Sequence, residues 1–192
     1  STQDLMPKFL TDQQVEQYHR DGFVSPVRVM PEEEAISLRS KIEVFEASQG
    51  EPIHGTQKTK AFLRFPWAYD LVMRPEILDA VEDVMGPDIL CYQHGTWFKE
   101  PESGSYVSWH QDATYMGIEP HTFITPWLAL TPSNPQLGCI KAIPGSHKDG
   151  IRLHHDTFGE DNILTRGQTV AEVDEAAAVD LSDGFECGVS YG

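Results

Sequence analysis

The sequence predicts a mainly β fold with an N-terminal helical layer, organised as a single domain of residues 1–192. Two patterns predict this fold. Up to residue 88, apolar residues recur at helical spacing between residues that typically begin and end helices. From residue 89 onward, short apolar and aromatic runs alternate with turn sequences, as they do in β-sandwiches and barrels. We therefore expect a helical layer (1–88) packed on a β-core (89–192).

Three helices are predicted in the first part of the chain. The first begins after Thr11, which forms a capping-box pattern with Gln14, and a glycine at position 22 ends it. Proline begins the other two helices, where its missing N–H costs nothing, and glycine ends them. These helices run from Pro31 to Gly50 and from Pro75 to Gly86.

The second part of the chain reads as short strands. One further stretch, AEVDEAAAVDL at 171–181, fits either a helix or a strand. Its alanines favour a helix, whereas its valines, which alternate with acids, fit a strand. Turn sequences rich in proline, glycine and asparagine separate the apolar runs. The predicted strands are ILCYQHGTWFKE from Ile89, SYVSWHQD from Ser105, FITPWLALT from Phe123 and CIKAIPGS from Cys139.

Composition narrows the class of protein. The formal net charge of −16 argues against nucleic acids and anionic membrane surfaces as partners. No apolar run approaches the roughly 20 residues that a membrane helix needs, and the N-terminal sequence lacks a signal-peptide pattern. The three cysteines are too widely spaced to suggest a disulfide framework or a CxxC metal pair. We expect a cytoplasmic protein.

The stretch SYVSWHQDATYMG contains His110 and Asp112, two residues apart. On a strand, residues i and i+2 point to the same face, so the imidazole and the carboxylate would converge. Such a pair provides two of the three ligands of a 2-His-1-carboxylate site, which suits non-haem Fe(II). On spacing alone, a core histidine that an aspartate holds by a hydrogen bond is the favoured interpretation.

Three longer motifs carry a family resemblance. The first is WHQDATYMG, the second is WLALTPSNPQLGCIKAIPGSHK, and the third is HDTFGEDNILTRGQ. In this order and spacing they resemble the phytanoyl-CoA dioxygenase family, from the LTDQQVEQYHRDGF segment to about Asp180. The resemblance implies a double-stranded β-helix, that is, a cupin-like jelly roll. It also implies an Fe(II)- and 2-oxoglutarate-dependent oxygenase, and it favours the metal interpretation of the His-x-Asp pair.

The resemblance assigns site residues only where the motifs match. His110 and Asp112 fall on the first two iron ligands, and Trp127 falls on a tryptophan that lines the cosubstrate pocket. A core aromatic is the alternative for Trp127. Lys60 resembles a family lysine near the cosubstrate carboxylates, with a surface position as the alternative. Gln93 and Lys99 share strand parity in the run from Ile89, so both would face the pocket, with a solvated strand end as the alternative for Lys99. We therefore expect Lys60, Gln93, Lys99 and Trp127 to bind 2-oxoglutarate.

Other histidines and one arginine receive different interpretations. His147, in PGSHK, matches a family motif that does not bind iron, so we expect a structural turn residue. His154 and His155 are expected in a loop, solvated or facing substrate. Arg166 fits either the mouth of the pocket or an ion pair with a nearby acid.

The sequence departs from the family pattern after the VDL strand. No histidine follows His155 and no arginine follows Arg166, so the distal iron ligand and the arginine that anchors 2-oxoglutarate have no counterpart in this chain. We therefore expect a jelly roll that is incomplete at its C-terminus and that binds Fe(II) weakly. Exposed strand edges would favour a homo-oligomer or a partner that covers them.

The function predicted from the sequence is hydroxylation of a small organic substrate with Fe(II), 2-oxoglutarate and O₂. Two other classes remain open at this point. One is a catalytically inactive relative that acts as a binding or interaction module. The other is a cupin-like metal enzyme with different chemistry, such as an isomerase or a hydrolase. Asp112 argues against the halogenating relatives, in which a small residue at this position leaves room for halide.

Overall fold

The computed structural model describes residues 6–181 and 187–191, and most of its helices precede its strands. The α-helices are α1 (Asp12–Asp21), α2 (Glu32–Gln49), α3 (Gly55–Thr59), α4 (Pro66–Val72), α5 (Pro75–Met85) and α6 (Ala113–Met116). The strands are β1 (Phe23–Val27), β2 (Ile124–Leu128), β3 (Ile140–Ala142), β4 (His154–His155), β5 (Thr169–Val170), β6 (Val179–Leu181) and β7 (Cys187–Tyr191). Short 3₁₀ helices are η1 (Ala61–Leu63), η2 (Pro135–Leu137), η3 (Ser146–Asp149) and η4 (Glu175–Ala177).

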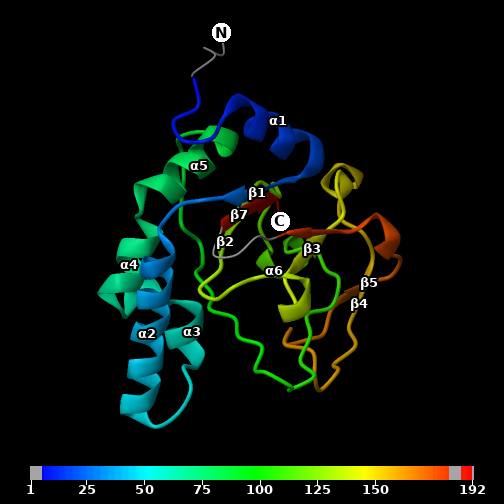
Figure 1. Ribbon diagram of the computed structural model, residues 1–192. Helices are drawn as coiled ribbons and strands as arrows, with labels where there is room; N and C mark the ends of the chain where they lie inside the picture. The colour runs from blue at the N-terminus through cyan, green and yellow to red at the C-terminus, as the bar shows by residue number, and fades with distance from the viewer. Residues whose placement is uncertain (1–5, 182–186, 192) are drawn as a thin grey trace.

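The helices and the loop-rich part lie on opposite sides of a small central sheet. Figure 1 shows α2, α3 and α4 together on one side, and β3, β4 and β5 with long connections on the other. Helix α1 and strand β1 follow each other directly and bring the N-terminal segment onto the sheet (Figure 1). The helices therefore cover one side of the molecule, but strand β1, which lies within the part expected to be helical, belongs to the sheet.

The predicted helix ends are confirmed. The Thr11 hydroxyl accepts a hydrogen bond from the Gln14 backbone N–H (3.2 Å), and the Gln14 side chain accepts one from the Thr11 N–H (2.9 Å). Gly22 ends α1 in the left-handed conformation, with a φ of 86°, and Gly50 ends α2 in the same way, with a φ of 78°. A side chain is strained at such angles, which explains why both positions are glycine.

The strands form three small antiparallel sheets. The largest has the order β1-β7-β2, with Thr125 opposite Ser190 and Trp127 opposite Gly188. The other two are the pairs β3–β6 and β4–β5. The ambiguous stretch at 171–181 resolves into the short helix η4 followed by strand β6.

Strand β2 has one face toward the helices and the other toward the loops. The core cluster includes Tyr18 from α1, Val24 and Val27 from β1, and Leu38 from α2. Ile124 and Leu128 of β2 are partly buried and pack against this cluster, so their side chains face the helical layer. Because side chains alternate along a strand, Thr125 and Trp127 point to the opposite face.

Two of the predicted strands are absent, and this changes the fold prediction. Residues 86–105 and 107–111 run without strand pairing, and Tyr106 makes only an isolated bridge to Asn162. An apolar run forms a strand only where another strand hydrogen-bonds to it, and neither run has such a partner among the described residues. The predictions for the runs from Ile89 and Ser105 are therefore wrong, whereas β2 and β3 confirm those from Phe123 and Cys139.

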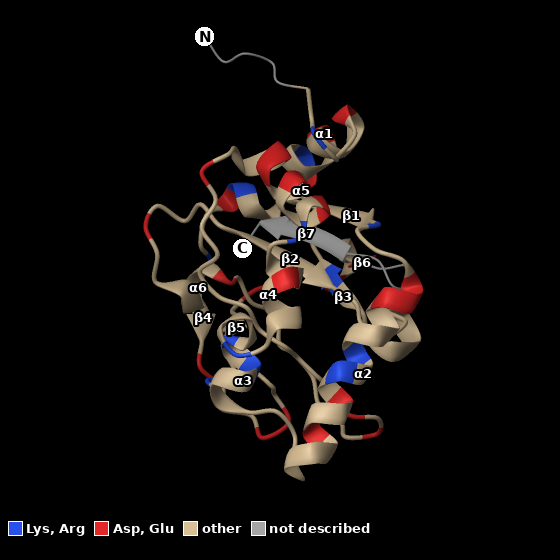
Figure 2. Ribbon diagram, turned by 90° about the vertical axis from the view of Figure 1, so that its left-hand side faces the viewer, with Lys and Arg blue, Asp and Glu red and all other residues tan. Residues whose placement is uncertain are grey.

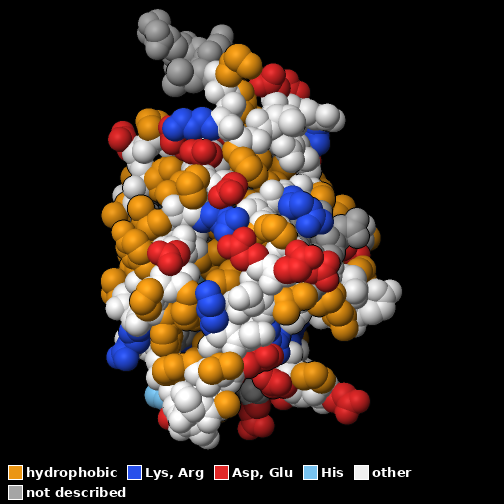
Figure 3. Space-filling model, turned by 60° about the vertical axis from the view of Figure 1, so that its left-hand side comes forward, with side chains coloured by type: hydrophobic (Ala, Val, Ile, Leu, Met, Phe, Trp, Pro, Cys, Tyr) orange, Lys and Arg blue, Asp and Glu red, His pale blue; other side chains and the backbone are white. Residues whose placement is uncertain are grey.

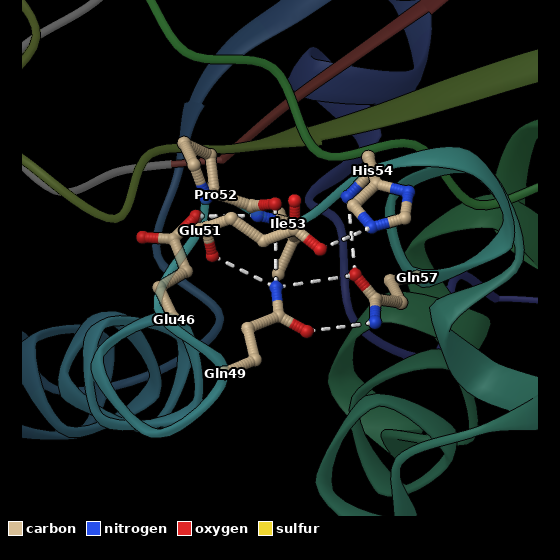
Figure 4. A network of polar contacts seen from close by, with 7 residues as sticks. All are labelled: Glu46, Gln49, Glu51, Pro52, Ile53, His54 and Gln57. Atoms are coloured by element: carbon tan, nitrogen blue, oxygen red, sulfur yellow. Dashed lines mark hydrogen bonds and ion pairs between the residues drawn. The ribbon is translucent and has the colours of Figure 1, made fainter.

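A polar network connects α2 to α3. Gln49 and Gln57 exchange hydrogen bonds between their side-chain amides, with the shorter one 2.9 Å from Gln57 Nε2 to Gln49 Oε1 (Figure 4). The Glu46 carboxylate accepts the Ile53 N–H at 2.8 Å, and the Gln57 side chain accepts the His54 N–H at 3.1 Å. These contacts satisfy the backbone N–H groups of the two residues directly before α3, and they hold the connection between the two helices.

The acidic residues are spread over several helices and loops and are not gathered in one segment (Figure 2). Figure 2 shows acidic positions on helices and on loops in several parts of the molecule. Hydrophobic side chains reach the surface between charged ones on the face in Figure 3. Within residues 6–181 and 187–191, no helix combines the length and the apolar composition needed to cross a membrane.

Candidate metal centre

His110 and Asp112 converge at a turn rather than on a strand. Extended chain reaches Gln111, and Asp112 then takes helical angles (φ −58°, ψ −29°) as the N-cap residue of α6. Despite this turn, His110 Nε2 lies 3.1 Å from Asp112 Oδ1. The predicted convergence is confirmed, but its cause is the turn at Gln111 and Asp112, and not the alternation of a strand.

The second nitrogen of His110 determines what the first can do. His110 Nδ1 lies 2.8 Å from the backbone oxygen of Ser108. A carbonyl oxygen can only accept, so Nδ1 carries the proton. In the neutral ring the Nε2 lone pair would then face a carboxylate at hydrogen-bonding distance, which is repulsive unless a cation lies between them. The pair is therefore suited to hold either a proton or a metal ion, and a histidine anchored to a carbonyl in this way is typical of metal sites.

The pKa shifts of His110 and Asp112 also indicate that the pair holds a proton when no metal is bound. Burial disfavours the charged form of His110, but the hydrogen bonds to Asp112 and to the Ser108 carbonyl outweigh it and raise the pKa of the ring. Burial also disfavours the ionised form of Asp112, yet His110 and the hydroxyl of Thr125 outweigh it and lower the pKa of the carboxyl. In the absence of a metal, the pair therefore holds a proton on His110 opposite an ionised Asp112.

A buried polar network positions the carbonyl that anchors His110. The Ser108 hydroxyl donates to the backbone oxygen of Gln168 at 2.6 Å and accepts from Asn162 Nδ2 at 2.9 Å. The Asn162 Oδ1 atom in turn accepts the Leu164 N–H at 3.1 Å. Ser108, Asn162 and Gln168 are all buried. The Ser108 hydroxyl and the Asn162 side-chain amide are thus both engaged in a buried site, which restricts the Ser108 backbone and so the orientation of the His110 ring.

Strand β2 supports the carboxylate from the other side. Thr125 Oγ1 donates to Asp112 Oδ2 at 3.0 Å, which leaves Oδ1 directed at the histidine. Trp127 follows two residues later and shares this face of the strand with Thr125. The ring of Tyr115, from α6, meets the His110 ring edge to face at 5.8 Å between centroids. The aromatic ring of Tyr115 therefore lies beside a polar pair whose oxygens and nitrogens are each oriented by a contact.

The structure does not bring the other predicted cosubstrate residues to this pair. Lys60 is exposed at the end of α3, and Gln93 is exposed in the extended stretch that lacks strand pairing. The Lys99 ammonium donates to the backbone oxygen of Gly138. The predicted shared strand face of Gln93 and Lys99 is wrong, because no strand forms there; their role in binding 2-oxoglutarate stays a prediction.

The remaining predicted residues lie in three places. His147 belongs to η3, next to Gly22 at the end of α1, which agrees with a structural turn residue. Arg166 pairs with Asp156, so the ion-pair alternative is confirmed. His154 and His155 form strand β4 rather than a loop, and the His154 ring accepts the backbone N–H of Gln111 at 2.9 Å. The expectation of two solvated or substrate-facing histidines is therefore wrong for His154.

Three supporting residues were not predicted from the sequence. Ser108, Thr125 and Gln111 have no metal-ligand signature, since serine, threonine and glutamine are common in strands and turns. The one available signal was that Thr125 interrupts the apolar run FITPWLALT, at a position where a buried strand would otherwise carry an aliphatic residue. Within the part of the chain that the structure describes, no group of three or more His, Cys, Asp or Glu side chains is placed to hold a metal ion.

Sequence comparisons show which known proteins this chain resembles. The profile of the phytanoyl-CoA dioxygenase (PhyH) family matches residues 18–182. The methylphosphonate hydroxylase of Gimesia maris is 27% identical over 164 residues, which cover 78% of this chain and 62% of that protein. Phytanoyl-CoA dioxygenase 1 of Oryza sativa subsp. japonica is 44% identical over 55 residues, 29% of this chain and 20% of the relative. The matched part thus spans about a fifth of the rice protein and less than two thirds of the bacterial one.

Structure comparison agrees with the sequence match. The solved structure of the non-haem monooxygenase ThoJ, in its apo form, has a TM-score of 0.78 and 32% sequence identity with this chain. The match covers 93% of this chain and 67% of ThoJ. A nickel complex of ThoJ has a TM-score of 0.72 and 30% identity, with 93% of this chain and 66% of ThoJ covered. The helices, small sheets and loops described above therefore have the fold of a non-haem oxygenase.

Proposed function

Because the chain belongs to the phytanoyl-CoA dioxygenase family, we propose that it is an oxygenase that uses Fe(II), 2-oxoglutarate and O₂ to hydroxylate a small organic substrate. One observation carries the proposal. His110 Nε2 and Asp112 Oδ1 face each other at 3.1 Å, while the other ring nitrogen and the other carboxylate oxygen are each held by a hydrogen bond. A pair that is oriented at both ends is already arranged as a ligand set.

The donor set fits Fe(II). One imidazole nitrogen and one carboxylate oxygen are two members of the facial triad that leaves positions open for cosubstrate and O₂. A relative of similar fold, ThoJ, has been solved as a nickel complex, which supports the binding of a divalent metal by this fold. The other positions would be filled by 2-oxoglutarate, water, and a ligand from outside the described residues.

Each residue near the pair has a distinct task in this proposal. The iron, once bound, supplies the oxidation chemistry. His110 donates its Nδ1 proton to Ser108, which keeps Nε2 free to bind. Asp112 provides a negative charge that balances the metal, and Thr125 keeps one of its oxygens occupied. Trp127, on the same strand face as Thr125, forms a wall for the cosubstrate. The roles of Lys60, Gln93 and Lys99 toward 2-oxoglutarate stay predictions, since all three are exposed and the Lys99 ammonium donates to the Gly138 carbonyl.

Two finer statements belong to the same proposal. We propose that the three small sheets are parts of a double-stranded β-helix, which is supported by the match to non-haem oxygenase structures. The substrate class is a small polar molecule. The similarity to a methylphosphonate hydroxylase over 78% of this chain supports that class more broadly along the chain than the 55-residue match to the rice protein supports an acyl-CoA.

The test is succinate formation from 2-oxoglutarate with Fe(II), measured for the 192-residue chain and for a version extended by the distal-histidine strand of the family. We expect turnover in the extended version and none after Asp112→Ala, which removes a ligand and its charge. Glu43→Ala, on the exposed face of α2, is the matched control and should leave turnover unchanged. Unchanged turnover in the Asp112 variant would refute the site.

The 192-residue chain addresses the second candidate, a binding module without turnover. The described residues bring only two ligands to the site, which favours weak iron binding in this polypeptide. We expect weak Fe(II) binding by calorimetry and no succinate. Tight stoichiometric iron with turnover in this polypeptide would show that another ligand completes the site, and it would exclude the binding module.

A further inference from the structure

Gln111 is the residue between the two ligands, and the 150–154 segment holds it at three atoms. Its side-chain Nε2 donates to the backbone oxygen of Gly150 at 3.0 Å, and its Oε1 accepts the Arg152 N–H at 2.7 Å. Its backbone N–H donates to His154 Nε2 at 2.9 Å. The amide nitrogen and the amide oxygen of the Gln111 side chain, together with its backbone N–H, therefore hold the turn between the two ligands on this segment.

The tautomer of His154 makes this contact possible. His154 Nδ1 lies 2.8 Å from the backbone oxygen of Arg152, an acceptor, so Nδ1 carries the proton. Nε2 then has a free lone pair, and the N–H of Gln111 occupies it. Strand pairing of His154 with Val170, and a hydrogen bond from the Val170 N–H to the Trp109 oxygen at 2.9 Å, close a ring around the turn.

The opposite side of the same residue is also fixed. The Gln111 carbonyl accepts the hydroxyl of Thr114 at 2.7 Å and its backbone N–H at 3.2 Å. The N–H and the carbonyl of Gln111 are thus both engaged, one by β4 and the other by α6. Because His110 and Asp112 flank this residue, any rotation of its backbone moves the two ligands relative to each other. Their 3.1 Å separation therefore depends on contacts that neither ligand makes itself.

We propose that Gln111 and His154 are positioning residues that set the spacing of the two metal ligands. The proposal rests on the proposed function, since it treats His110 and Asp112 as a metal site. His154 acts only through the backbone N–H of Gln111, and Gln111 acts through the turn that it occupies. The structure gives His154 this task because it is half-buried, holds the accepting tautomer, and reaches the ligand turn from a different strand.

The experiment compares His154→Leu, which removes the acceptor, with His154→Gln, whose side-chain oxygen can accept the same N–H. His155→Leu is the matched control, because His155 is exposed and, as the next residue of β4, points to the other face of the strand. Co(II), with its visible absorption, serves as the probe in place of Fe(II). We expect His154→Leu to weaken Co(II) binding about tenfold and to change its absorption spectrum. His154→Gln should restore both, and His155→Leu should alter neither.

Stability and metal binding are read separately. All measurements are made well below the thermal midpoint of each variant, because a purely structural histidine would lower that midpoint without changing the Co(II) spectrum of the folded protein. An unchanged affinity and spectrum in His154→Leu would overturn the proposal. Gln111→Leu, which keeps the backbone N–H but loses both side-chain contacts, should weaken Co(II) binding in the same direction.

A metal-free measurement keeps the two proposals distinguishable. Nitrogen-15 NMR of the His110 ring reports its Nδ1–H bond to Ser108 without any metal. We expect this signal to shift or broaden in His154→Leu and to recover in His154→Gln. If the version extended by the distal-histidine strand failed to bind Co(II), the metal proposal would fail, and the ring signal of the metal-free chain would still decide the positioning proposal. An identical ring signal in wild type and His154→Leu would refute it.

Discussion

His110 Nε2 lies 3.1 Å from Asp112 Oδ1 although the two residues share no regular secondary structure. Three separate contacts produce this relationship. The Ser108 carbonyl orients the ring, the Thr125 hydroxyl orients the carboxylate, and the 150–154 segment holds the turn between them. Each contact comes from a different part of the chain, so the pair forms only once the fold brings strand β2, strand β4 and the Ser108 network together. The site is thus a product of tertiary structure.

The contact from Thr125 to Asp112 predicts the effect of Thr125→Val. Valine keeps the shape of threonine but cannot donate, so Asp112 Oδ2 loses its hydrogen bond and the carboxylate is free to rotate. We expect Co(II) affinity to fall at least about tenfold, as it does when outer partners of metal ligands are removed. Isothermal titration calorimetry measures this change. Thr122→Val is the control, because the exposed Thr122 hydroxyl donates to the nearby Pro120 carbonyl and not, among the described residues, to a group of the site. Equal effects of the two variants would contradict the role of Thr125.

The charge pair predicts how the metal-free protein responds to pH. The pKa of His110 is raised, so its stabilising effect is complete below its unfolded value near 6.5 and is lost as pH rises through the folded pKa. The pKa of Asp112 is lowered, so its contribution is present above the unfolded value near 3.8 and is lost as pH falls through the folded pKa. Together they stabilise the metal-free fold most between about pH 4 and 6.5.

A comparison with Asp112→Asn isolates this effect from the other titrating groups. We expect the difference in unfolding free energy between the wild-type protein and the variant to shrink as pH rises from 6 to 8, measured by urea denaturation with EDTA present. Metal binding should show the opposite trend. A divalent ion must displace the proton between the two side chains, so stabilisation by Co(II) should grow over the same pH range. A pH-independent difference in EDTA would show that the pair does not hold a proton.

The ends of α1, α2 and α5 could be predicted from the sequence, because their signals lie within a few residues, whereas the short helices α3, α4 and α6 were not predicted. Thr11 and Gln14 cap α1 by contacts three residues apart, and Gly22 ends the helix by its own backbone angles. The convergence of His110 and Asp112 was likewise predictable from their spacing. The turn that causes this convergence was not predictable. The segment SYVSWHQD has a β-type composition, but among the described residues no strand pairs with it. Composition shows that a segment prefers extended structure, and only the rest of the fold decides whether another strand pairs with it.

The supporting contacts could not be predicted because they join residues far apart in sequence. His154 lies 43 positions from Gln111, and Asn162 lies 54 positions from Ser108. Nothing in either residue's neighbourhood marks it as a partner. Lys99 shows the reverse case. Its position suggested a ligand for 2-oxoglutarate, but a nearer acceptor, the carbonyl of Gly138, takes its ammonium group. Side chains with long flexible stems bind whatever acceptor the fold places within reach.

Asp83 predicts a stability effect outside the site. Its carboxylate on α5 accepts the backbone N–H groups of Lys8, Phe9 and Leu10 at 2.6–2.9 Å, which fixes the segment that leads into α1. Asp83→Asn removes the charge and one accepting oxygen. We expect a loss of about 1.5–3 kcal/mol in unfolding free energy, the usual value for hydrogen bonds to a charged group. Asp79→Asn, one turn earlier on the same helix, is the control for urea denaturation. A similar loss in both variants would mean that only the charge of α5 matters.

Gly22 and Gly50 separate backbone strain from side-chain crowding, because both end a helix at nearly the same positive φ. A Cβ at Gly50 would meet no atom within 4 Å, whereas one at Gly22 would lie 2.7 Å from Cγ of the His147 ring and closer still to Nδ1. Gly50→Ala should therefore cost only the left-handed backbone, about 1–2 kcal/mol. Gly22→Ala should cost at least about 1 kcal/mol more, because the His147 ring must move in a packed region. Urea denaturation of both variants measures the difference. His147→Ala in the Gly22→Ala background should recover the extra cost as a coupling energy. Equal losses at the two glycines, or no coupling with His147, would show that the PGSHK turn does not pack tightly on the end of α1.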